Sequence, residues 1–147
     1  MAISAPSGRV RIVVVDDFEP FRKALFQLFS EFKVIEVVGE AADGNSAIET
    51  TLYLLPEVVI MDVKMPRLNG VEATRRIKRA IPDIHVVGIS SQDDRATRES
   101  MTNAGCAAFV IKECAHTLPE VIARLTGRLL AKDAEIPFPS PRSSVDF

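Results

Sequence analysis

The chain has 147 residues, of which 47% are hydrophobic and 26% are charged, and its formal net charge is −2 from 18 basic and 20 acidic side chains. This length and composition are typical of one globular domain with a substantial apolar core. The near balance of charge argues against direct nucleic-acid binding by bulk electrostatics, which requires a basic face or a high pI.

The first three predicted strands are short apolar runs, and a helical pattern follows each of them. Residues 11–15 form a β-branched run that ends on two acids, and apolar residues then recur at helical spacing as far as residue 32. Residues 34–39 predict a second strand, followed by a helix that begins after a turn at residues 43–44 and ends before Pro56. The third strand, residues 57–61, leads through a loop containing Pro66 into a helix that extends to residue 81.

The last two units repeat this order. Residues 84–89 predict a fourth strand, and residues 93–104 predict a helix with Gly105 as its C-terminal cap. Residues 107–111 predict a fifth strand. The inward face of the last predicted helix is formed by five apolar residues, Leu118, Val121, Ile122, Leu125 and Leu129.

This alternation predicts an α/β fold, a doubly wound parallel sheet with helices on both faces. The central strands are apolar throughout because parallel strands in such sheets are buried on both sides. Residues 1–8 predict a flexible N-terminus, and the Pro/Ser-rich residues 132–147 predict an extended or disordered tail or linker.

The two cysteines and the absence of a long apolar stretch bear on location. Cys106 and Cys114 lie on either side of the fifth strand, and because a strand rises about 3.3 Å per residue they are too far apart for a disulfide. No run of 18 or more apolar residues predicts a transmembrane helix, and residues 1–8 do not resemble a secretory signal. We therefore expect free thiols, no membrane association and a cytoplasmic location.

Each of the five predicted strands is followed by a residue that carries charge or a hydroxyl group. In doubly wound sheets ligands bind beyond the carboxyl ends of the strands, so these residues are the candidates for a site. Strand two ends at Glu40, which suggests no obvious chemistry. The remaining candidates are Asp16 and Asp17 from strand one, Asp62 from strand three, Ser90 from strand four and Lys112 from strand five.

Each candidate alone also has an ordinary structural explanation. Asp17 and Ser90 could cap helices, Asp62 could be a turn residue, and Lys112 could be a solvated lysine. Together they indicate a site, because two carboxylates about 4 Å apart repel by roughly 4 kcal/mol at an effective dielectric constant near 20. A cation would relieve that repulsion, and all-oxygen ligands suit Mg²⁺ where phosphate is also bound. Lys112 and Ser90 could then neutralise and hydrogen-bond added negative charge.

The order and spacing of these motifs resemble response-regulator receiver domains of two-component signalling over residues 9–131. The matching segments are VVVDD, GEAADG, VVIMDVKMPRLNG, VVGIS, NAGCAAFVIK and the last amphipathic helix. The resemblance implies a flavodoxin-like (βα)5 three-layer sandwich with strand order 2-1-3-4-5. It also implies a signalling switch rather than an enzyme, with at most self-phosphotransfer and autodephosphorylation.

The resemblance assigns roles to individual residues. Asp62 is expected to be the phosphoacceptor, and Lys112 to neutralise phosphoryl oxygens. Asp17, Asp62 and the backbone carbonyl of Lys64 are expected to bind Mg²⁺, with Asp16 acting through a water. Ser90 and Phe109 are expected to be the switch residues, and the sparse apolar content of the fourth helix suggests that it is the mobile element.

The resemblance also implies partners. The expected donor is a sensor histidine kinase or a phosphotransfer protein, and the expected output surface is formed by helix 4, strand 5 and helix 5. Glu113 follows Lys112 where many receivers have proline, which resembles the branch that precedes a helix-turn-helix output domain. Whether the chain is a stand-alone receiver or part of a longer regulator, and whether it is a monomer or a phosphorylation-dependent homodimer, stays open.

Three rival functions compete with this interpretation. An aspartate-nucleophile phosphohydrolase requires a second acid two residues after the nucleophile, where this chain has Lys64. A flavin or dinucleotide module requires a Gly-rich or hydroxyl-rich loop after strand one, where this chain has the acidic DDFEPF. The third is a receiver-like interaction module that works without phosphorylation, which retention of all the site residues disfavours.

Overall fold

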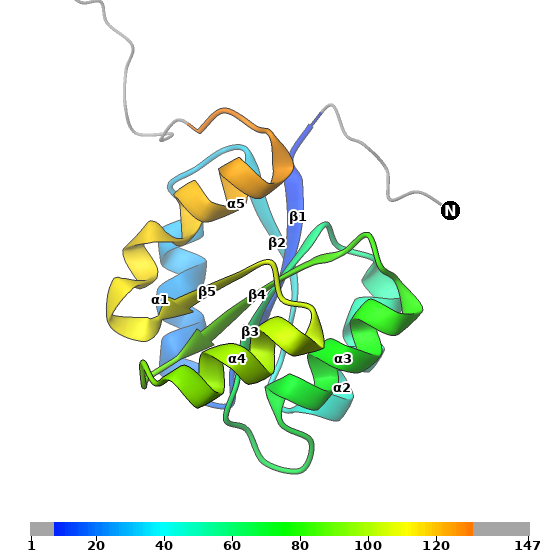
Figure 1. Cartoon of the computed structure of the whole chain (residues 1–147). Helices are drawn as coiled ribbons and strands as arrows, with labels where there is room; N and C mark the ends of the chain where they lie inside the picture. Colours follow the sequence, from blue (N-terminus) through cyan, green and yellow to red (C-terminus); the bar gives the residue numbers. More distant parts are fainter. Residues whose placement is uncertain (1–7, 131–147) are drawn as a thin grey trace, which may run out of the picture.

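The computed structural model describes residues 8–130, which form a parallel five-stranded sheet with helices on both faces (Figure 1). Residues 1–7 and 131–147 lie outside the described residues, and with them most of the predicted flexible N-terminus and the whole predicted tail. The elements in chain order are β1 (Val10–Val15), α1 (Glu19–Phe29), β2 (Ile35–Ala41), α2 (Gly44–Leu54), β3 (Val58–Asp62), α3 (Gly70–Ala80), β4 (His85–Ser90), α4 (Arg95–Ala104), β5 (Ala108–Ile111), a 3₁₀ segment η1 (Lys112–Thr117) and α5 (Leu118–Thr126).

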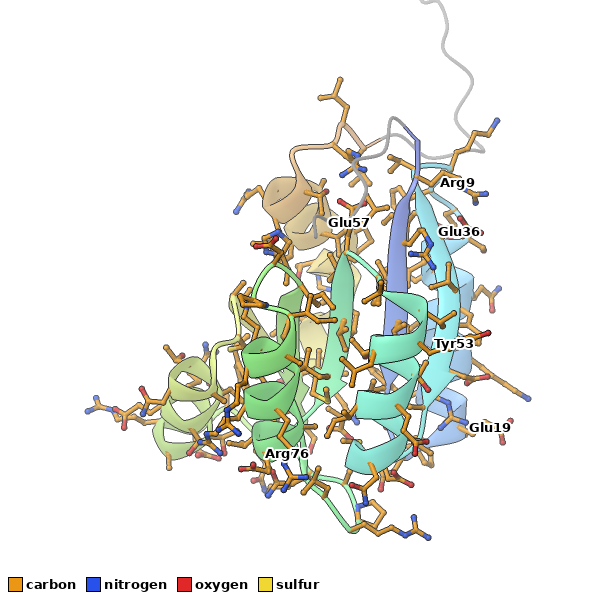
Figure 2. The ribbon with its side chains drawn as sticks, turned by 90° about the vertical axis from the view of Figure 1, so that its right-hand side faces the viewer. Arg9, Glu19, Glu36, Tyr53, Glu57 and Arg76 are labelled. Atoms are coloured by element: carbon orange, nitrogen blue, oxygen red, sulfur yellow. The ribbon has the colours of Figure 1, made fainter. Side chains whose placement is uncertain are left out.

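The sheet order is β2-β1-β3-β4-β5 and every pairing is parallel, which confirms the predicted fold class. All five residues of β3 are buried, as expected for the central strand of a sheet covered on both faces. Because the strands are parallel, their carboxyl ends meet at one edge of the sheet. Figure 2 shows Arg9 and Glu57 near the opposite edge, where β1 and β3 begin.

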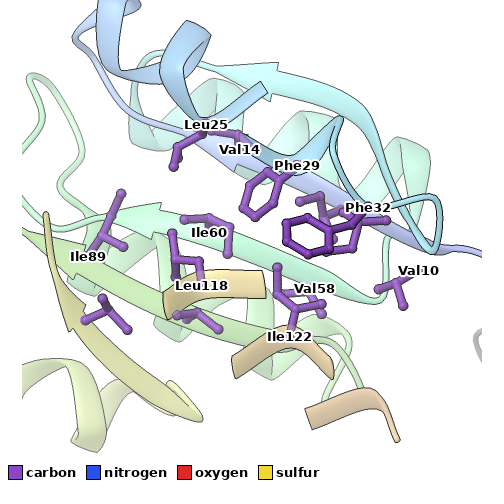
Figure 3. Close-up of a cluster of buried hydrophobic side chains, with 14 residues drawn as sticks. Val10, Val14, Leu25, Phe29, Phe32, Val58, Ile60, Ile89, Leu118 and Ile122 are labelled. Atoms are coloured by element: carbon purple, nitrogen blue, oxygen red, sulfur yellow. The ribbon is translucent and has the colours of Figure 1, made fainter. Parts of the chain in front are cut away.

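Two apolar clusters hold the helices onto the sheet. One packs Leu25 and Phe29 of α1 and Leu118 and Ile122 of α5 against one face (Figure 3). The other packs α2, α3 and α4 against the opposite face, and Met101 is the large apolar residue through which α4 joins it. Burial of a large apolar side chain contributes roughly 1.5–3 kcal/mol, so α4 is held by fewer such contributions than α1.

Short polar side chains fix where three of the helices begin. Asp43, Asn69 and Asp94 each accept a hydrogen bond from a backbone N–H three residues later, at the starts of α2, α3 and α4. Gly105 has φ of 113° and ends α4, as predicted. These caps fix the first turns of α2, α3 and α4 after the loops that follow β2, β3 and β4.

The structure corrects three sequence-based boundaries. The prediction that Leu129 faces inward on the last helix is wrong, because Gly127 adopts φ of 70° and ends α5 at Thr126, which leaves Leu129 93% exposed. Strand β2 continues past residue 39 to Ala41, and α4 begins at Arg95 because Asp94 caps it.

Two further expectations concern the cysteines and the membrane. Cys106 and Cys114 are free thiols, as expected. Within residues 8–130, no helix combines the length and the apolar character needed to cross a membrane.

Candidate functional site

Three carboxylates meet at the carboxyl edge of the sheet. Asp62 is the last residue of β3, and Asp16 and Asp17 directly follow the neighbouring strand β1. One oxygen from each of the three side chains lies within 4.8 Å of the others. Asp16 is fully buried and Asp62 is 4% exposed, whereas Asp17 is exposed. The sequence prediction that these acids come together is confirmed by their placement.

Lys112 supplies a positive charge beside the acids. Its Nζ lies 2.6 Å from Asp16 Oδ2 and 3.7 Å from Asp62 Oδ2. The same ammonium lies 4.6 Å from the centre of the Phe21 ring, close enough for a cation–π contact. Lys112 is the first residue after β5, so the two acid-bearing strands and the lysine-bearing strand converge on one point.

Asp16 does not cap a helix but is fixed by contacts from several elements. Its Oδ1 accepts a hydrogen bond of 2.8 Å from the backbone N–H of Phe18, and its own N–H donates to the Ala41 carbonyl at the end of β2. The N-cap of α1 is Phe18, which makes no side-chain capping hydrogen bond. Asp17 therefore does not serve as the cap, and its carboxylate is directed to the cluster of acids.

The crowding of charges changes the acidity of Asp62. The pKa of Asp62 is raised from its usual 3.8 to about 7, first by burial and then by the negative charges of Asp16 and Asp17, an increase that Lys112 partly offsets. A carboxyl group whose pKa rises on folding binds more protons in the folded state than in the unfolded state. Ionisation of Asp62 therefore opposes folding.

We expect the stability of the metal-free protein to fall as pH rises between about 4 and 7, because over that range the unfolded chain has already lost the Asp62 proton that the folded chain retains. The Asp62→Asn variant lacks this proton equilibrium, so its gain in melting temperature over the wild type should be larger near pH 8 than near pH 5. Thermal unfolding in the presence of a chelator measures both values. Equal gains at the two pH values would contradict the assignment of the raised pKa to Asp62.

The arrangement of ligands fits a hard divalent cation. Three carboxylates share the site with one lysine, so the negative charge exceeds the positive charge, and the repulsion from Asp16 and Asp17 adds to the effect of burial in raising the pKa of Asp62. An all-oxygen set of this kind suits Mg²⁺. Asp17, the exposed member, provides the open side that a cation sharing its ligands with phosphate needs.

Ser90 and the loops around it form another side of the same edge. Ser90 ends β4, is 1% exposed, and its hydroxyl accepts a hydrogen bond of 3.1 Å from the backbone N–H of Gln92. It does not cap α4, because Asp94 does. Lys64, in the loop after β3, donates from Nζ to Gln92 Oε1 at 2.7 Å and so links the loops that follow β3 and β4.

Phe109 lies one strand away from Ser90, on the side covered by α4. It pairs with Gly88 in the sheet register, and its ring has the Arg98 guanidinium of α4 at 4.8 Å from its centre. A Cβ at Gly88 would lie 3.1 Å from the Phe109 ring and 2.8 Å from Met101, so the missing side chain there gives both groups their space. Phe109 is thus packed between β4 and α4.

Sequence reasoning missed the role of Gly70. A Cβ at this position would lie 2.0 Å from the Asp62 carbonyl oxygen, and the Gly70 N–H donates to the Val63 carbonyl at 2.8 Å. The first turn of α3 is therefore packed directly on the end of β3. The sequence shows glycine directly after the Asn69 cap, but the obstacle to a side chain there is a backbone carbonyl of another element, which the sequence pattern does not show.

A cavity on the molecule lies away from the site. A cavity of about 530 Å³ lies along α1 and the edge strand β2, and its lining includes none of the three acids, Ser90 or Lys112. The acids are instead at the rim of the sheet, accessible through Asp17. An exposed rim suits a reaction with a group carried on another macromolecule.

Comparison with known proteins gives a consistent match. The family model of the response regulator receiver domain matches residues 12–125. The transcriptional regulatory protein DegU of Brevibacillus brevis is 33% identical over 106 residues, covering 72% of this chain and 45% of DegU. A protein-glutamate methylesterase/protein-glutamine glutaminase of Alkalilimnicola ehrlichii is 38% identical over 128 residues, covering 84% of this chain and 33% of that enzyme.

A solved structure matches the fold as well. The signal receiver domain of the response regulator NarL from Mycobacterium tuberculosis is 31% identical, with a TM-score of 0.74, and the match covers 82% of this chain and 99% of that domain. The chain thus spans about half or less of the curated relatives above and nearly the whole of an isolated receiver domain.

Proposed function

The chain belongs to the response regulator receiver domain family of two-component systems, and on that premise we propose that it accepts a phosphoryl group on Asp62 and thereby switches an output surface. The observation that carries the proposal is the convergence of three carboxylates and Lys112 at the carboxyl edge of the sheet. We assign the receiver to residues 9–131, a range that contains every helix and strand of the structure.

The proposed reaction is a direct displacement at phosphorus. A carboxylate oxygen of Asp62 attacks the phosphorus of a donor phosphohistidine, the phosphorus–nitrogen bond breaks, and the imidazole nitrogen keeps the electron pair and takes up a proton. Such transfers depend on positioning and neutralisation of charge. Burial fixes Asp62 at the end of β3, and Lys112 lies near enough to neutralise the oxygens of the incoming phosphoryl group.

The metal and its ligands follow from the same set of residues. Mg²⁺ would be held by Asp17, Asp62 and the backbone carbonyl of Lys64, with Asp16 acting through a water, and it would neutralise charge on the transferred group. Asp16 is already engaged by Lys112 and by the Phe18 N–H, which supports an indirect role for it. Asp17 does not cap α1, and its carboxylate is exposed, which supports a direct role in binding the cation.

The test is transfer from a small phosphodonor. Wild-type protein incubated with acetyl phosphate and Mg²⁺ should gain one phosphoryl group by intact mass, and a chelator should prevent the gain. If the wild type gains no phosphoryl group when acetyl phosphate and Mg²⁺ are both present, the proposal is overturned.

The proposed switch joins Ser90, Phe109 and α4. The aspartyl phosphate places a new doubly charged group beside the Ser90 hydroxyl, which turns toward it and gives up the hydrogen bond from Gln92. Phe109 then turns inward into the space that Ser90 vacates. Met101 is the large apolar residue that anchors α4, so this helix can respond to the change, and uniform amide-exchange protection across all the helices would count against that.

Ser90→Ala is expected to keep phosphorylation and to weaken the response of α4. The variant removes the hydroxyl that would bond the phosphoryl oxygen but leaves Asp62 and Lys112 in place. Intact mass should therefore match the wild type, whereas phosphorylation-dependent changes in the NMR signals of Phe109 and α4 should shrink. Ser91→Ala, at the exposed next position, is the matched control. An unchanged response in Ser90→Ala would remove Ser90 from the mechanism.

Partners and location follow from the proposed function. The donor is a histidine kinase or phosphotransfer protein, and the output surface is formed by α4, β5 and α5, acting on a downstream partner or an attached output domain. A chain of this kind works in the cytoplasm, as a monomer or a phosphorylation-dependent homodimer. DegU is a transcriptional regulator and the Alkalilimnicola relative is an esterase, so the receiver is compatible with more than one kind of output.

A receiver-like interaction module that works without phosphorylation is the remaining alternative. Such a module would have no need of the raised pKa of Asp62 or of the Lys112 contact, both of which are present. The mass measurement above separates the two functions.

A further inference from the structure

A side chain from α1 holds the peptide group between the two adjacent acids. Arg22 donates from Nη1 to the Asp16 carbonyl oxygen at 2.6 Å and from Nε to Glu40 Oε1 at 2.6 Å. Its side chain is 14% exposed, whereas that of Glu40 is 47% exposed. The Asp16 carbonyl belongs to the peptide that joins Asp16 to Asp17, so Arg22 acts on the backbone that orients both carboxylates.

Glu40 reaches Arg22 because the register of the edge strand shifts. Strand β2 pairs only with β1 among the described residues, and the pairing changes from Ile12↔Val37 to Val13↔Gly39, which leaves Val38 without a partner. Side chains in a strand alternate between the two faces, so one extra residue moves every later side chain to the other face. The shift is what decides on which face Glu40 lies.

The apolar residues of β2 show this change of face. Before the shift, Val37 packs in the cluster with α1 and α5; after it, Ala41 packs in the cluster with α2, α3 and α4, although both positions are odd in number. Glu40 is level with Val14, a member of the α1 cluster, and so it points to α1. Without the extra residue, Glu40 would face α2 and Arg22 would lose its carboxylate partner.

The same shift supplies a second contact to Asp16. The N–H of Asp16 donates to the Ala41 carbonyl at 3.0 Å, directly after Glu40 in the strand. Both backbone groups of Asp16 are therefore held from outside β1, the N–H by β2 and the carbonyl by Arg22, which is itself held by β2.

We propose that Arg22 and Glu40 form a positioning pair that sets the orientation of Asp16 and Asp17 for the divalent cation. This proposal rests on the proposed function in so far as the cation is Mg²⁺. Residues that orient metal ligands from outside the coordination sphere commonly raise metal affinity about 10–100-fold. The pair would also give Glu40 a function, which its position in the sequence alone did not suggest.

Whether loss of Arg22 strengthens or weakens Mg²⁺ binding separates a positioning role from a purely electrostatic one. Arg22 carries a positive charge next to a cation site, so removal of its charge alone would make Mg²⁺ bind more tightly. Loss of positioning has the opposite effect. We therefore expect Arg22→Met to weaken Mg²⁺ binding by about tenfold or more, as judged by NMR titration of the Asp17 and Phe18 amides of the full chain.

Lys23→Met is the matched control. Lys23 is the next residue on α1, its side chain is 72% exposed and it pairs only loosely with Glu19 at 3.6 Å. The substitution removes the same charge without touching Asp16, so Mg²⁺ affinity should stay the same or rise slightly. Mg²⁺ binding to Arg22→Met that is as tight as, or tighter than, binding to the wild type would overturn the proposal.

Two further measurements keep the test decisive. If Arg22→Met does not fold, Glu40→Gln and Glu40→Ala replace it: both remove one negative charge, but only Gln can still accept from Arg22, so Ala should weaken Mg²⁺ binding more, and equal binding would overturn the proposal. If the wild type does not bind Mg²⁺, the metal assignment fails. The pair is then judged in metal-free protein, where Arg22→Met should speed amide exchange at Asp17 and Phe18, and unchanged exchange would refute it.

Discussion

Asp62→Asn is expected to abolish phosphoryl uptake from acetyl phosphate while the protein stays folded. Asparagine has the shape of aspartate, but its amide is not a nucleophile toward phosphorus, so no aspartyl phosphate can form. The neutral side chain also removes the cost of burying a charge at this position and the repulsion from Asp16 and Asp17, the two effects that raise the pKa of Asp62, so the variant should be more stable than the wild type in metal-free buffer. Lost transfer therefore cannot be explained by unfolding. Intact mass with Mg²⁺ present measures the transfer.

Asp93→Asn is the control for Asp62→Asn. Asp93 is a carboxylate beyond the end of β4 whose side chain is 52% exposed and pairs with Arg98, outside the cluster of three acids. Its replacement should leave the gain of one phosphoryl group intact. Equal modification of wild type and Asp62→Asn, or a phosphopeptide that contains Asp16 instead, would show that the acceptor had been assigned to the wrong residue.

Gly70→Ala is expected to damage both stability and phosphoryl transfer. The added Cβ would lie 2.0 Å from the Asp62 carbonyl oxygen and 2.9 Å from its carbon, and both are backbone atoms that cannot rotate away. Either α3 or the end of β3 must move. Overpacking commonly costs about 1–3 kcal/mol, and because the obstacle is backbone we expect the upper part of that range, a fall in melting temperature of roughly 5–15 °C. Movement of Asp62 should also slow transfer.

Alanine substitutions at two other glycines are the controls for Gly70→Ala. A Cβ added at Gly8 would meet no described atom within 4 Å, so Gly8→Ala should leave both properties unchanged. Gly127 also has open space but a φ of 70°, so Gly127→Ala should cost about 1–2 kcal/mol from left-handed backbone strain and leave transfer intact. If Gly70→Ala were no less stable than Gly127→Ala, the close contact between α3 and β3 would be in error.

The strands and the site residues were predictable because both depend on local pattern. Buried parallel strands are apolar throughout, and their carboxyl ends share one edge, so Asp62 and Lys112 could be placed together from sequence although they are far apart in the chain. The end of the last helix was not predicted, because the apolar spacing continues to Leu129 while Gly127 stops the helix.

The shift in β2 could not be predicted for a different reason. Val37 and Val38 are both apolar, so the sequence has no alternation from which the change of face could be inferred. The Arg22–Glu40 contact depends on that shift and joins residues with no shared motif. The need for glycine at position 70 could not be predicted either, because the atom that excludes a side chain there is the carbonyl oxygen of Asp62, in another element.

The position of Lys112 at the end of the fifth strand has a consequence for biosynthesis. The carboxylates come from β1 and β3, which are neighbours, whereas β5 pairs only with β4 among the described residues and is the last of these five strands to be synthesised. A nascent chain that has formed β1 and β3 holds its acids together without the ammonium that balances them. Under the proposed function, we therefore expect competence to accept a phosphoryl group to arise only when β5 has joined the sheet and placed Lys112 beside the acids.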